Sequence, residues 1–244
     1  MNLYREQGVV LRTWKLGEAD RIVVLMTQGQ GKVRAVAKGV RKTKSRFGGR
    51  LEPFSHVDLS LYRGRELDIV TQAEVIAPFR ALREDYDRVV AGSAMLEAVD
   101  QVAQEREAAV RIYLLLVRAL RALDGAPPDP SVVLDAFLLK LMAVEGYRPS
   151  LAACAGCGGT GPLRAFSTVR GGAICDRCRS GTESPLDRGT VPLLAALLGG
   201  DLDRVGAASA GAPAGPRREA GTLVRAFVEY HLDRRLRSYP LVAR

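Results

Sequence analysis

The sequence predicts an α+β protein in which a small N-terminal β-barrel precedes an α-helical domain with a cysteine-rich module. Up to residue 77, apolar residues tend to alternate with polar ones, which is the period of a β-strand. From Pro78 onward they recur every three to four residues, which is the period of a helix. All four cysteines fall in a glycine-rich segment at about 151–180. We therefore expect domains at 1–77 and 78–244, with the module as an insert in the second domain.

Five short strands are expected in the first domain, at 8–14, 21–27, 32–37, 56–62 and 67–75. Turns that contain glycine separate the first three strands from one another and the fourth from the fifth. Closing five strands into a barrel removes the exposed edges that an open sheet would leave. The pattern favours an OB-fold, a barrel that commonly binds single-stranded nucleic acid. An SH3-like barrel is the alternative on the strand pattern alone.

The second domain is expected to consist of amphipathic helices. They fall at 79–103, as one or two segments, and at 107–123, 130–146, 190–198 and 217–237. Asp129 and Pro130 mark the start of one helix, because aspartate caps a helix N-terminus and proline fits its first turn. The stripe expected to be buried on the 107–123 helix is Val110, Tyr113, Leu114, Val117 and Leu120. Such stripes form packing cores rather than cofactor sites.

The cysteines form two C-x2-C pairs, Cys154 with Cys157 and Cys175 with Cys178, and 17 residues separate the pairs. Each pair directs two thiolates at one metal ion, and two pairs complete the tetrahedron that zinc prefers. Disulfides are disfavoured in a cytoplasmic protein, and a redox C-x2-C pair does not account for the second pair. We expect one structural Zn²⁺, because four cysteine ligands leave no open position for catalysis.

Positive charge is concentrated at the two ends of the chain, whose formal net charge is +9. Residues 1–77 contain 14 lysines and arginines against 8 acidic residues, and residues 217–244 contain 7 against 3. The stretch between them is balanced, with 15 basic and 16 acidic residues. A polyanion that contacts both ends is the functional interpretation, and a generally basic, solvated surface is the alternative.

A basic segment at 38–50 joins the third and fourth expected strands. It has six basic residues and no acidic one: Lys38, Arg41, Lys42, Lys44, Arg46 and Arg50. Loops of an OB-fold supply contacts to nucleic acid, and lysine and arginine neutralise phosphates without selecting a sequence. We expect DNA contact here, and the alternative is a solvated loop. Phe47 in the same segment either stacks on a base or anchors the core.

The sequence offers no catalytic constellation. His56 and His231 are the two histidines, and neither accompanies an evident nucleophile, so both are expected to be structural. No G-x4-G-K-[ST] motif for nucleotide phosphates occurs. The N-terminus does not have the pattern of a signal peptide, and no run approaches the roughly 20 apolar residues of a membrane span. We therefore expect a non-enzymatic cytoplasmic protein without a membrane partner.

Short motifs follow one another in the first 54 residues. They are Gly8-Val9-Val10-Leu11-Arg12, Gly17-Glu18-Ala19-Asp20-Arg21-Ile22, Gly31-Lys32, Ala37-Lys38-Gly39-Val40-Arg41, Lys44-Ser45 and Leu51-Glu52-Pro53-Phe54. Their order resembles that of the RecO family of bacterial recombination mediators. The stretch from Ala37 to Phe54 is the most specific part of the likeness. The helical middle, the cysteines and the basic last helix extend it over nearly the whole chain, although some family members lack the four cysteines.

The resemblance implies an OB-fold followed by a helical domain with a zinc module. It implies binding to single- and double-stranded DNA, annealing of complementary strands, and help in loading recombinase onto DNA coated by single-strand-binding protein. It also implies assembly with RecR, contact with single-strand-binding protein, and a place at the bacterial nucleoid. By motif match Lys38 and Arg41 are the first candidates for DNA contact. Weaker candidates lie in the last helix: Arg225, Arg234, Arg235 and Arg237.

Two other functions compete with this one. An RNA- or ribosome-associated zinc-binding OB-fold protein would have the same barrel, basic loop and metal site, but would prefer structured RNA to DNA. A metalloenzyme acting on nucleic acid would need an open metal position and a general base, and the sequence shows neither.

Overall fold

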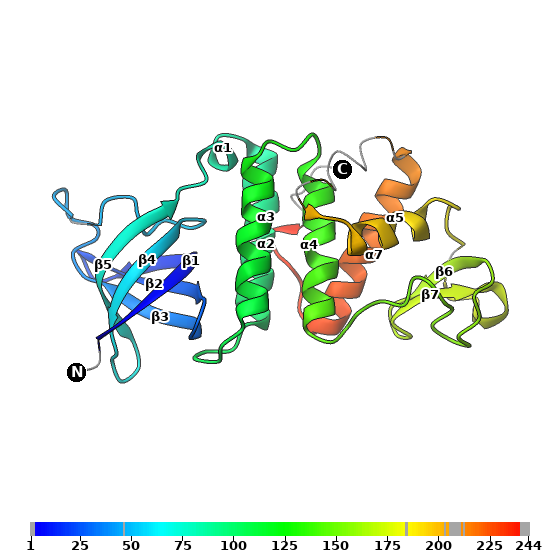
Figure 1. The fold of residues 1–244 in the computed structure, drawn as a ribbon, viewed down its shortest axis with the longest axis horizontal. Helices are drawn as coiled ribbons and strands as arrows, with labels where there is room; N and C mark the ends of the chain where they lie inside the picture. The colour runs from blue at the N-terminus through cyan, green and yellow to red at the C-terminus, as the bar shows by residue number, and fades with distance from the viewer. Residues whose placement is uncertain are drawn as a thin grey trace.

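The computed structural model describes residues 3–45, 47–183, 185–202, 204, 211 and 213–239. The molecule is elongated, with a β-barrel at one end, a group of helices in the middle and a small two-stranded sheet at the other end (Figure 1). The mixed α+β class expected from the sequence is confirmed. In the part of the chain that is described, no helix is both long and apolar enough to cross a membrane.

The barrel has five strands: β1 (Leu3–Leu16), β2 (Asp20–Thr27), β3 (Gly31–Ala37), β4 (His56–Tyr62) and β5 (Asp68–Ala77). It is closed in the order β1-β2-β3-β5-β4, with β1 antiparallel to both β2 and β4. The one parallel pair is β3 with β5. This order is that of the OB-fold and decides against the SH3-like alternative. β1 is longer than the expected 8–14, because its polar first half pairs with β4.

The two faces of β2 are buried in different cores. Val23 and Leu25 point into the barrel, whereas Val24 and Met26 point outward and pack against the helices. Successive side chains of a strand alternate between its faces, so a strand covered on both sides is apolar throughout. This explains the continuous run of apolar residues in β2, and it locates the contact between barrel and helices on the outer face of β1 and β2.

The helices are α1 (Arg80–Arg83), α2 (Tyr86–Val102), α3 (Val110–Asp124), α4 (Pro130–Val144), α5 (Thr190–Gly199) and α7 (Ala214–Leu232). The centre of the group is α4, which packs against α2, α3, α5 and α7. As expected, the Asp129 side chain caps α4 and accepts a hydrogen bond from the Ser131 N–H at 3.0 Å. The last helix both begins and ends earlier than the expected 217–237, and Asp233 terminates it in a left-handed conformation.

The stripe expected to be buried on α3 is only partly correct. Val110 and Leu114 are each 43% exposed, whereas Ile112 and Leu116 are buried. The reason is that α3 packs on α2 and α4 and also contacts β1 and β2. Two contact directions bury a different and broader sector than the single stripe that a period of 3.6 residues predicts.

The connection between α2 and α3 attaches the barrel to the helices. The Lys32 N–H donates to the Gln104 carbonyl at 3.2 Å, and the Arg106 N–H donates to the Lys32 carbonyl at 3.0 Å. Gly31, with a φ of 63°, stands at the closest approach, where a Cβ would lie 1.7 Å from the Glu107 carbonyl oxygen. Only glycine fits both this backbone conformation and this contact.

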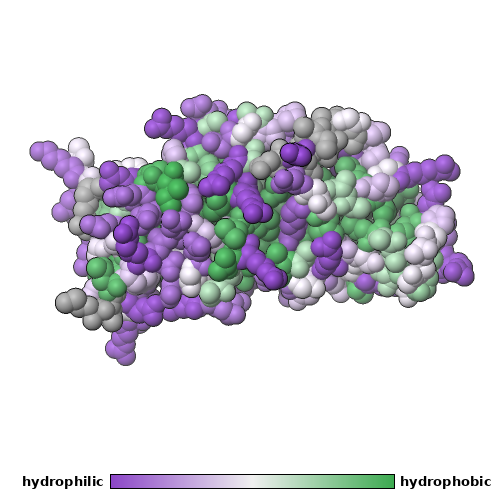
Figure 2. Space-filling model, viewed as in Figure 1, coloured by the Kyte–Doolittle hydropathy of each residue, from purple (hydrophilic) through white to green (hydrophobic). Residues whose placement is uncertain are grey.

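The second, smaller β-structure consists of β6 (Leu163–Ser167), β7 (Gly172–Cys175) and the short 3₁₀ helix η1 (Asp176–Cys178). We call residues 151–180 the cysteine lobe. Phe166 joins the lobe to the rest of the molecule, since its ring meets that of Phe227 in α7 edge to face, with the centroids 5.8 Å apart. In the view of Figure 2, hydrophilic side chains cover most of the barrel end, while apolar ones gather over the middle and toward the cysteine lobe.

Candidate metal centre and nucleic-acid interface

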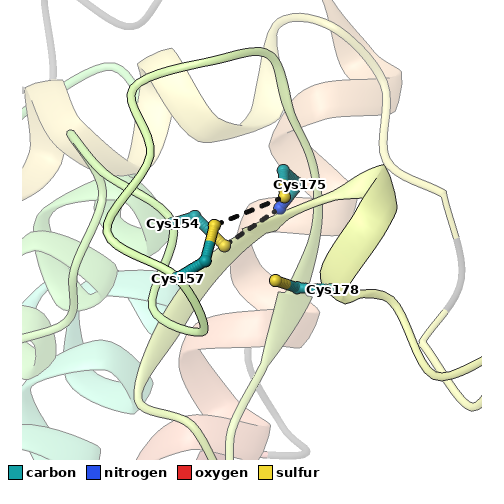
Figure 3. A group of neighbouring side chains, drawn as sticks. All are labelled: Cys154, Cys157, Cys175 and Cys178. Carbon is teal, nitrogen blue, oxygen red and sulfur yellow. Dashed lines mark hydrogen bonds between the residues drawn. The ribbon is translucent and has the colours of Figure 1, made fainter.

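The four cysteine side chains converge on one point of the cysteine lobe. Cys154 and Cys157 lie in the turn before β6, Cys175 ends β7 and Cys178 ends η1. Their sulfurs face one another (Figure 3) and all lie within 4.8 Å of one another. A zinc ion with Zn–S bonds of about 2.3 Å places its four sulfurs about 3.8 Å apart. The Cys157 and Cys175 sulfurs are 3.9 Å apart, so the group is compatible with a tetrahedral metal site.

The backbone around Cys154 forms the tight turn that such a site needs. The Gly158 N–H donates to the Cys154 carbonyl at 2.8 Å, and the Cys154 N–H donates to the Gly159 carbonyl at 2.8 Å. Gly158 has a φ of 72°, which favours glycine. At Gly156 a Cβ would come within 3.1 Å of the Cys178 sulfur. The glycines therefore let the two C-x2-C turns approach each other.

Backbone N–H donors favour a negative charge on the Cys154 thiol, whereas contacts among the thiols oppose one on Cys178. The Cys175 N–H donates to the Cys154 sulfur at 3.4 Å, and with the Gly156 N–H it lowers the pKa of the Cys154 thiol to about 6. The pKa of Cys178 rises to about 12, first because of its hydrogen bond to the Cys157 thiol and then because of Cys154. Four crowded thiols therefore cannot all ionise by themselves, and a bound dication would favour their joint deprotonation.

The predicted metal ligands are thus brought together, and they form the one group of three or more potential ligands among the described residues. The buried apolar centre of the lobe contains only Cys154, Ala165 and Ile174. So small a core gives little hydrophobic stabilisation. A metal at this site would serve mainly to hold the lobe together, because four protein ligands fill a tetrahedral shell.

The basic segment at 38–50 lies on the barrel surface between β3 and β4. The side chains of Lys38, Lys42, Lys44 and Arg50 are exposed. Within the described part of the chain, the ion pairs do not include the three lysines. Arg46, the sixth candidate, lies outside the described residues. The geometry thus presents these lysine charges to solvent, as a phosphate-binding loop requires.

Arg41, a candidate for DNA contact, also holds the basic segment in place through hydrogen bonds. Its Nη1 donates to the carbonyls of Gly17 at 3.2 Å and Glu18 at 2.8 Å. The Asp20 carboxylate in turn accepts a hydrogen bond from the Gly39 N–H at 2.7 Å. The motifs at 17–20 and 38–41, which are far apart in sequence, therefore pack against each other. Arg41 fixes the start of the basic segment on the β1–β2 turn and still exposes other N–H donors.

Phe47 is the core anchor of the segment. Its side chain is 1% exposed and belongs to the barrel core together with Val40 and Leu51. The alternative, in which Phe47 stacks on a base, is therefore wrong. Because Phe47 is buried midway along the segment, it anchors the segment to the barrel.

Sequence reasoning missed two arginines in the turn between β4 and β5. Arg63 and Arg65 are exposed and flank Gly64, and the Arg63 guanidinium lies 5.2 Å from the centroid of the Tyr4 ring. The loop between β4 and β5 is one of those with which OB-folds bind nucleic acid. The signal that could have found them is an arginine–glycine–arginine sequence in a turn of a predicted OB-fold.

Comparison with known proteins gives full-length matches. Residues 1–79 match the family described as Recombination protein O N terminal, and residues 83–240 match Recombination protein O C terminal. The chain is 52% identical to DNA repair protein RecO of Nocardioides sp. over 250 residues, which cover 99% of this chain and 100% of that protein. It is 50% identical to DNA repair protein RecO of Frankia casuarinae over 246 residues, covering all of both chains. The protein of the same name from Streptomyces avermitilis is 50% identical over 98% of each chain.

Proposed function

Because the chain belongs to the RecO family of DNA repair proteins, we propose that it is a non-enzymatic recombination mediator that binds single- and double-stranded DNA and anneals complementary strands. In this function it helps to load recombinase onto DNA coated by single-strand-binding protein, and it assembles with RecR and with that coating protein. Its place of action is the bacterial nucleoid in the cytoplasm.

The observation that carries the proposal is the basic segment at 38–50 on an OB-fold, in a chain that matches the family from end to end. Lys38, Lys42 and Lys44 are exposed and outside the described ion pairs, and Arg41 fixes the start of the segment. Arg46 and Arg50 complete the proposed DNA-contact set. An annealing protein needs to neutralise two backbones at once, and mobile lysine charges do this without reading sequence.

In the proposed arrangement, the two domains have different roles. The barrel of residues 1–77 binds DNA, and residues 78–244 form the helical domain that carries the metal module. One Zn²⁺ bound by Cys154, Cys157, Cys175 and Cys178 stabilises the cysteine lobe and takes no part in turnover. Of the arginines expected on the last helix, Arg225 is paired with Glu229 at 3.1 Å and is expected to contribute less, and the other three lie beyond the end of α7 at Leu232: Arg234, Arg235 and Arg237.

The experiment is annealing of complementary oligonucleotides precoated with the cognate single-strand-binding protein, without ATP. Wild type is compared with the triple variant Lys38→Ala, Lys42→Ala, Lys44→Ala, which leaves Arg41 and its turn intact. A matched control removes the exposed arginines Arg80, Arg111 and Arg118, so that both variants lose the same charge. Circular dichroism checks the folding of each protein.

We expect fast annealing by wild type and by the control, and at least tenfold slower annealing by the lysine variant. The slope of log affinity against log salt should also become shallower by about one for each phosphate that the variant no longer neutralises. Equal reductions in the two variants would contradict the assignment to this loop. No annealing by folded, zinc-loaded wild type would contradict the proposal, and a strong preference for structured RNA would favour the RNA- or ribosome-associated alternative.

A further inference from the structure

The four sulfurs of the cysteine lobe differ in how well solvent can reach them. Cys154 is only 2% exposed, Cys175 and Cys178 are partly buried, and Cys157 is exposed. The thiolate is the form of cysteine that reacts with oxidants, and binding to a metal keeps all four side chains in this form. Among the four, Cys157 therefore offers the sulfur that a small oxidant in solution reaches first.

A second sulfur lies close to that of Cys157. The Cys157 and Cys175 sulfurs are 3.9 Å apart (Figure 3). A disulfide requires an S–S distance of about 2.05 Å, so the two sulfurs must approach each other by roughly 1.9 Å. A small movement of one of the two segments is enough to join them.

The turn that carries Cys157 has the freedom to make this movement. Gly158 follows directly, with a φ of 72°, and Gly161 follows three residues later. A Cβ at either glycine would meet no atom of the described residues within 4 Å beyond its chain neighbours, so this part of the turn is bordered by solvent. Cys175, by contrast, ends β7 and is paired with Leu163 of β6. Cys157 therefore moves toward a fixed partner.

We infer that Cys157 and Cys175 form a redox switch, in which a two-electron oxidant such as hypochlorous acid joins them in a disulfide and the lobe releases its metal. The inference goes beyond DNA binding and rests only on the metal site of the proposed function. It agrees with the cytoplasmic location proposed above, because disulfides of cytoplasmic proteins are usually transient and serve redox sensing or catalysis.

The reaction takes place in two steps. The Cys157 thiolate attacks the chlorine of hypochlorous acid, so that an S–Cl bond forms, the O–Cl bond breaks and hydroxide leaves. The Cys175 thiolate then attacks the sulfur of Cys157, which forms the S–S bond and expels chloride. Each sulfur gives up one electron, and the chlorine gains two. A thiol reductant reverses the oxidation through a mixed disulfide.

Loss of these two ligands weakens the lobe. Cys154 and Cys178 remain, and two thiolates do not complete the four-coordinate shell of a structural zinc site. The buried centre of the lobe has only three residues, and one disulfide constrains a chain less than a metal with four ligands does. The oxidised lobe therefore loses order. This loss reaches the contact of Phe166 with Phe227 of α7, which joins the lobe to the helices.

The test uses the native full-length protein, reduced and loaded with zinc. Hypochlorous acid is added stepwise, and a chromogenic chelator measures the zinc released. We expect about one equivalent of oxidant for each zinc, since one disulfide takes two electrons. Methionine also reacts with such oxidants, but Met26, Met95 and Met142 are all 0% exposed. A dithiol with added zinc should restore the reduced, metal-bound protein.

Peptide mapping identifies the disulfide. Free thiols are alkylated before digestion with trypsin, which cleaves after Arg170 and Arg177 and places Cys175 on a peptide without another cysteine. Mass spectrometry should find this peptide joined mainly to the one that contains Cys154 and Cys157, and fragment ions should assign the bond to Cys157. Hydrogen exchange of the oxidised protein should show loss of amide protection in residues 151–180 and unchanged protection in β2 and β3.

Two histidine variants separate the reactive cysteine from the other ligands. Histidine replaces one cysteine in many structural zinc sites, so Cys157→His keeps four ligands but cannot form the disulfide. Cys178→His is the matched control, because it also keeps four ligands and retains Cys157 and Cys175. Starting from equal zinc content, Cys157→His should release zinc at least about tenfold more slowly than wild type, and Cys178→His as fast as wild type. If a variant does not load zinc, the peptide map of wild type decides.

Zinc release without a disulfide, or with a disulfide that excludes Cys157, would overturn the inference. Equally fast release from zinc-loaded Cys157→His would overturn it as well. Native protein with well below one zinc per chain would overturn the metal site and the switch together. Annealing by the reduced protein is measured separately, so failure of the switch and failure of the proposed DNA function are distinguishable.

Discussion

The barrel and the cysteine lobe are the two β-structures of this molecule, and different forces hold them. The barrel closes five strands around thirteen buried residues, most of them aliphatic, and a second core covers its outer face. The cysteine lobe has two short strands and a core of three residues, one of which is Cys154. Hydrophobic burial accounts for the barrel, whereas we propose that a metal held by the four sulfurs stabilises the lobe. Removal of the metal should therefore destabilise the cysteine lobe and leave the stability of the barrel unchanged.

The largest expected effect is the unfolding of the lobe on metal removal. Structural zinc sites contribute on the order of 10 kcal/mol to the folding of the segment that they hold. Chelation, or the substitution Cys154→Ser, should abolish amide protection in residues 151–180 and leave protection in β2 and β3 unchanged. Hydrogen exchange read by mass spectrometry measures both regions in one sample, and zinc content is measured in parallel.

The control for this prediction is DNA affinity, which should change by no more than about twofold because the proposed contacts lie on the barrel. A lobe that keeps its protection after zinc has been removed would show that its small core suffices. A barrel that loses protection together with the lobe would show that the two regions are coupled.

The next largest effect concerns the barrel core. Phe47→Ala removes a side chain that is 1% exposed, and such a change costs about 3–5 kcal/mol of unfolding free energy. Urea denaturation of the zinc-bound protein should show this decrease. Val169→Ala, at a residue of the cysteine lobe that is 72% exposed, should stay within about 0.5 kcal/mol of wild type. A Phe47 variant as stable as wild type would contradict the role of this ring as a core anchor.

The two regions also differ in what their sequences reveal. The spacing of the cysteines was enough to predict that they would meet, because the ligand geometry of one ion fixes four positions. Most strands of the barrel were predictable from alternation and β2 from its continuous apolar run, and β4 begins and ends as expected. The first half of β1 was missed, because residues such as Arg5 and Gln7 form a strand only through their pairing with β4.

What the sequence could not reveal depends on contacts between distant segments. The side chain of Phe47 has the same chemistry in a core as on a stacking surface, and only the packing of Val40 and Leu51 around it decides between the two. The buried stripe predicted on α3 was only partly correct for a related reason, since helices and barrel strands bury that helix from two directions.

The smallest of the three effects tests the junction between barrel and helices by pH. His56 of β4 is 3% exposed, and its Nε2 lies 2.8 Å from the hydroxyl of Tyr113 in α3. Burial, and secondarily the charge of Arg121, lowers the pKa of His56 to about 4. The unfolded chain binds this proton near pH 6.5, whereas the folded protein does not, so the contribution to stability is complete above about pH 6.5 and is lost as the pH falls toward 4.

A decrease of roughly 2–3 kcal/mol in unfolding free energy is expected from this histidine between pH 7 and pH 4.5. His56→Gln keeps a hydrogen-bonding group beside Tyr113 but does not titrate, so the variant should lose correspondingly less stability over the same range. Urea titrations of both proteins at each pH, with zinc content checked, measure the difference, and acid effects on the thiols are common to both and cancel. Identical pH dependence would mean that His56 is protonated without cost in the folded state. The barrel would then meet the helices through a junction that tolerates charge, and the contrast between the barrel and the cysteine lobe would rest on hydrophobic packing alone.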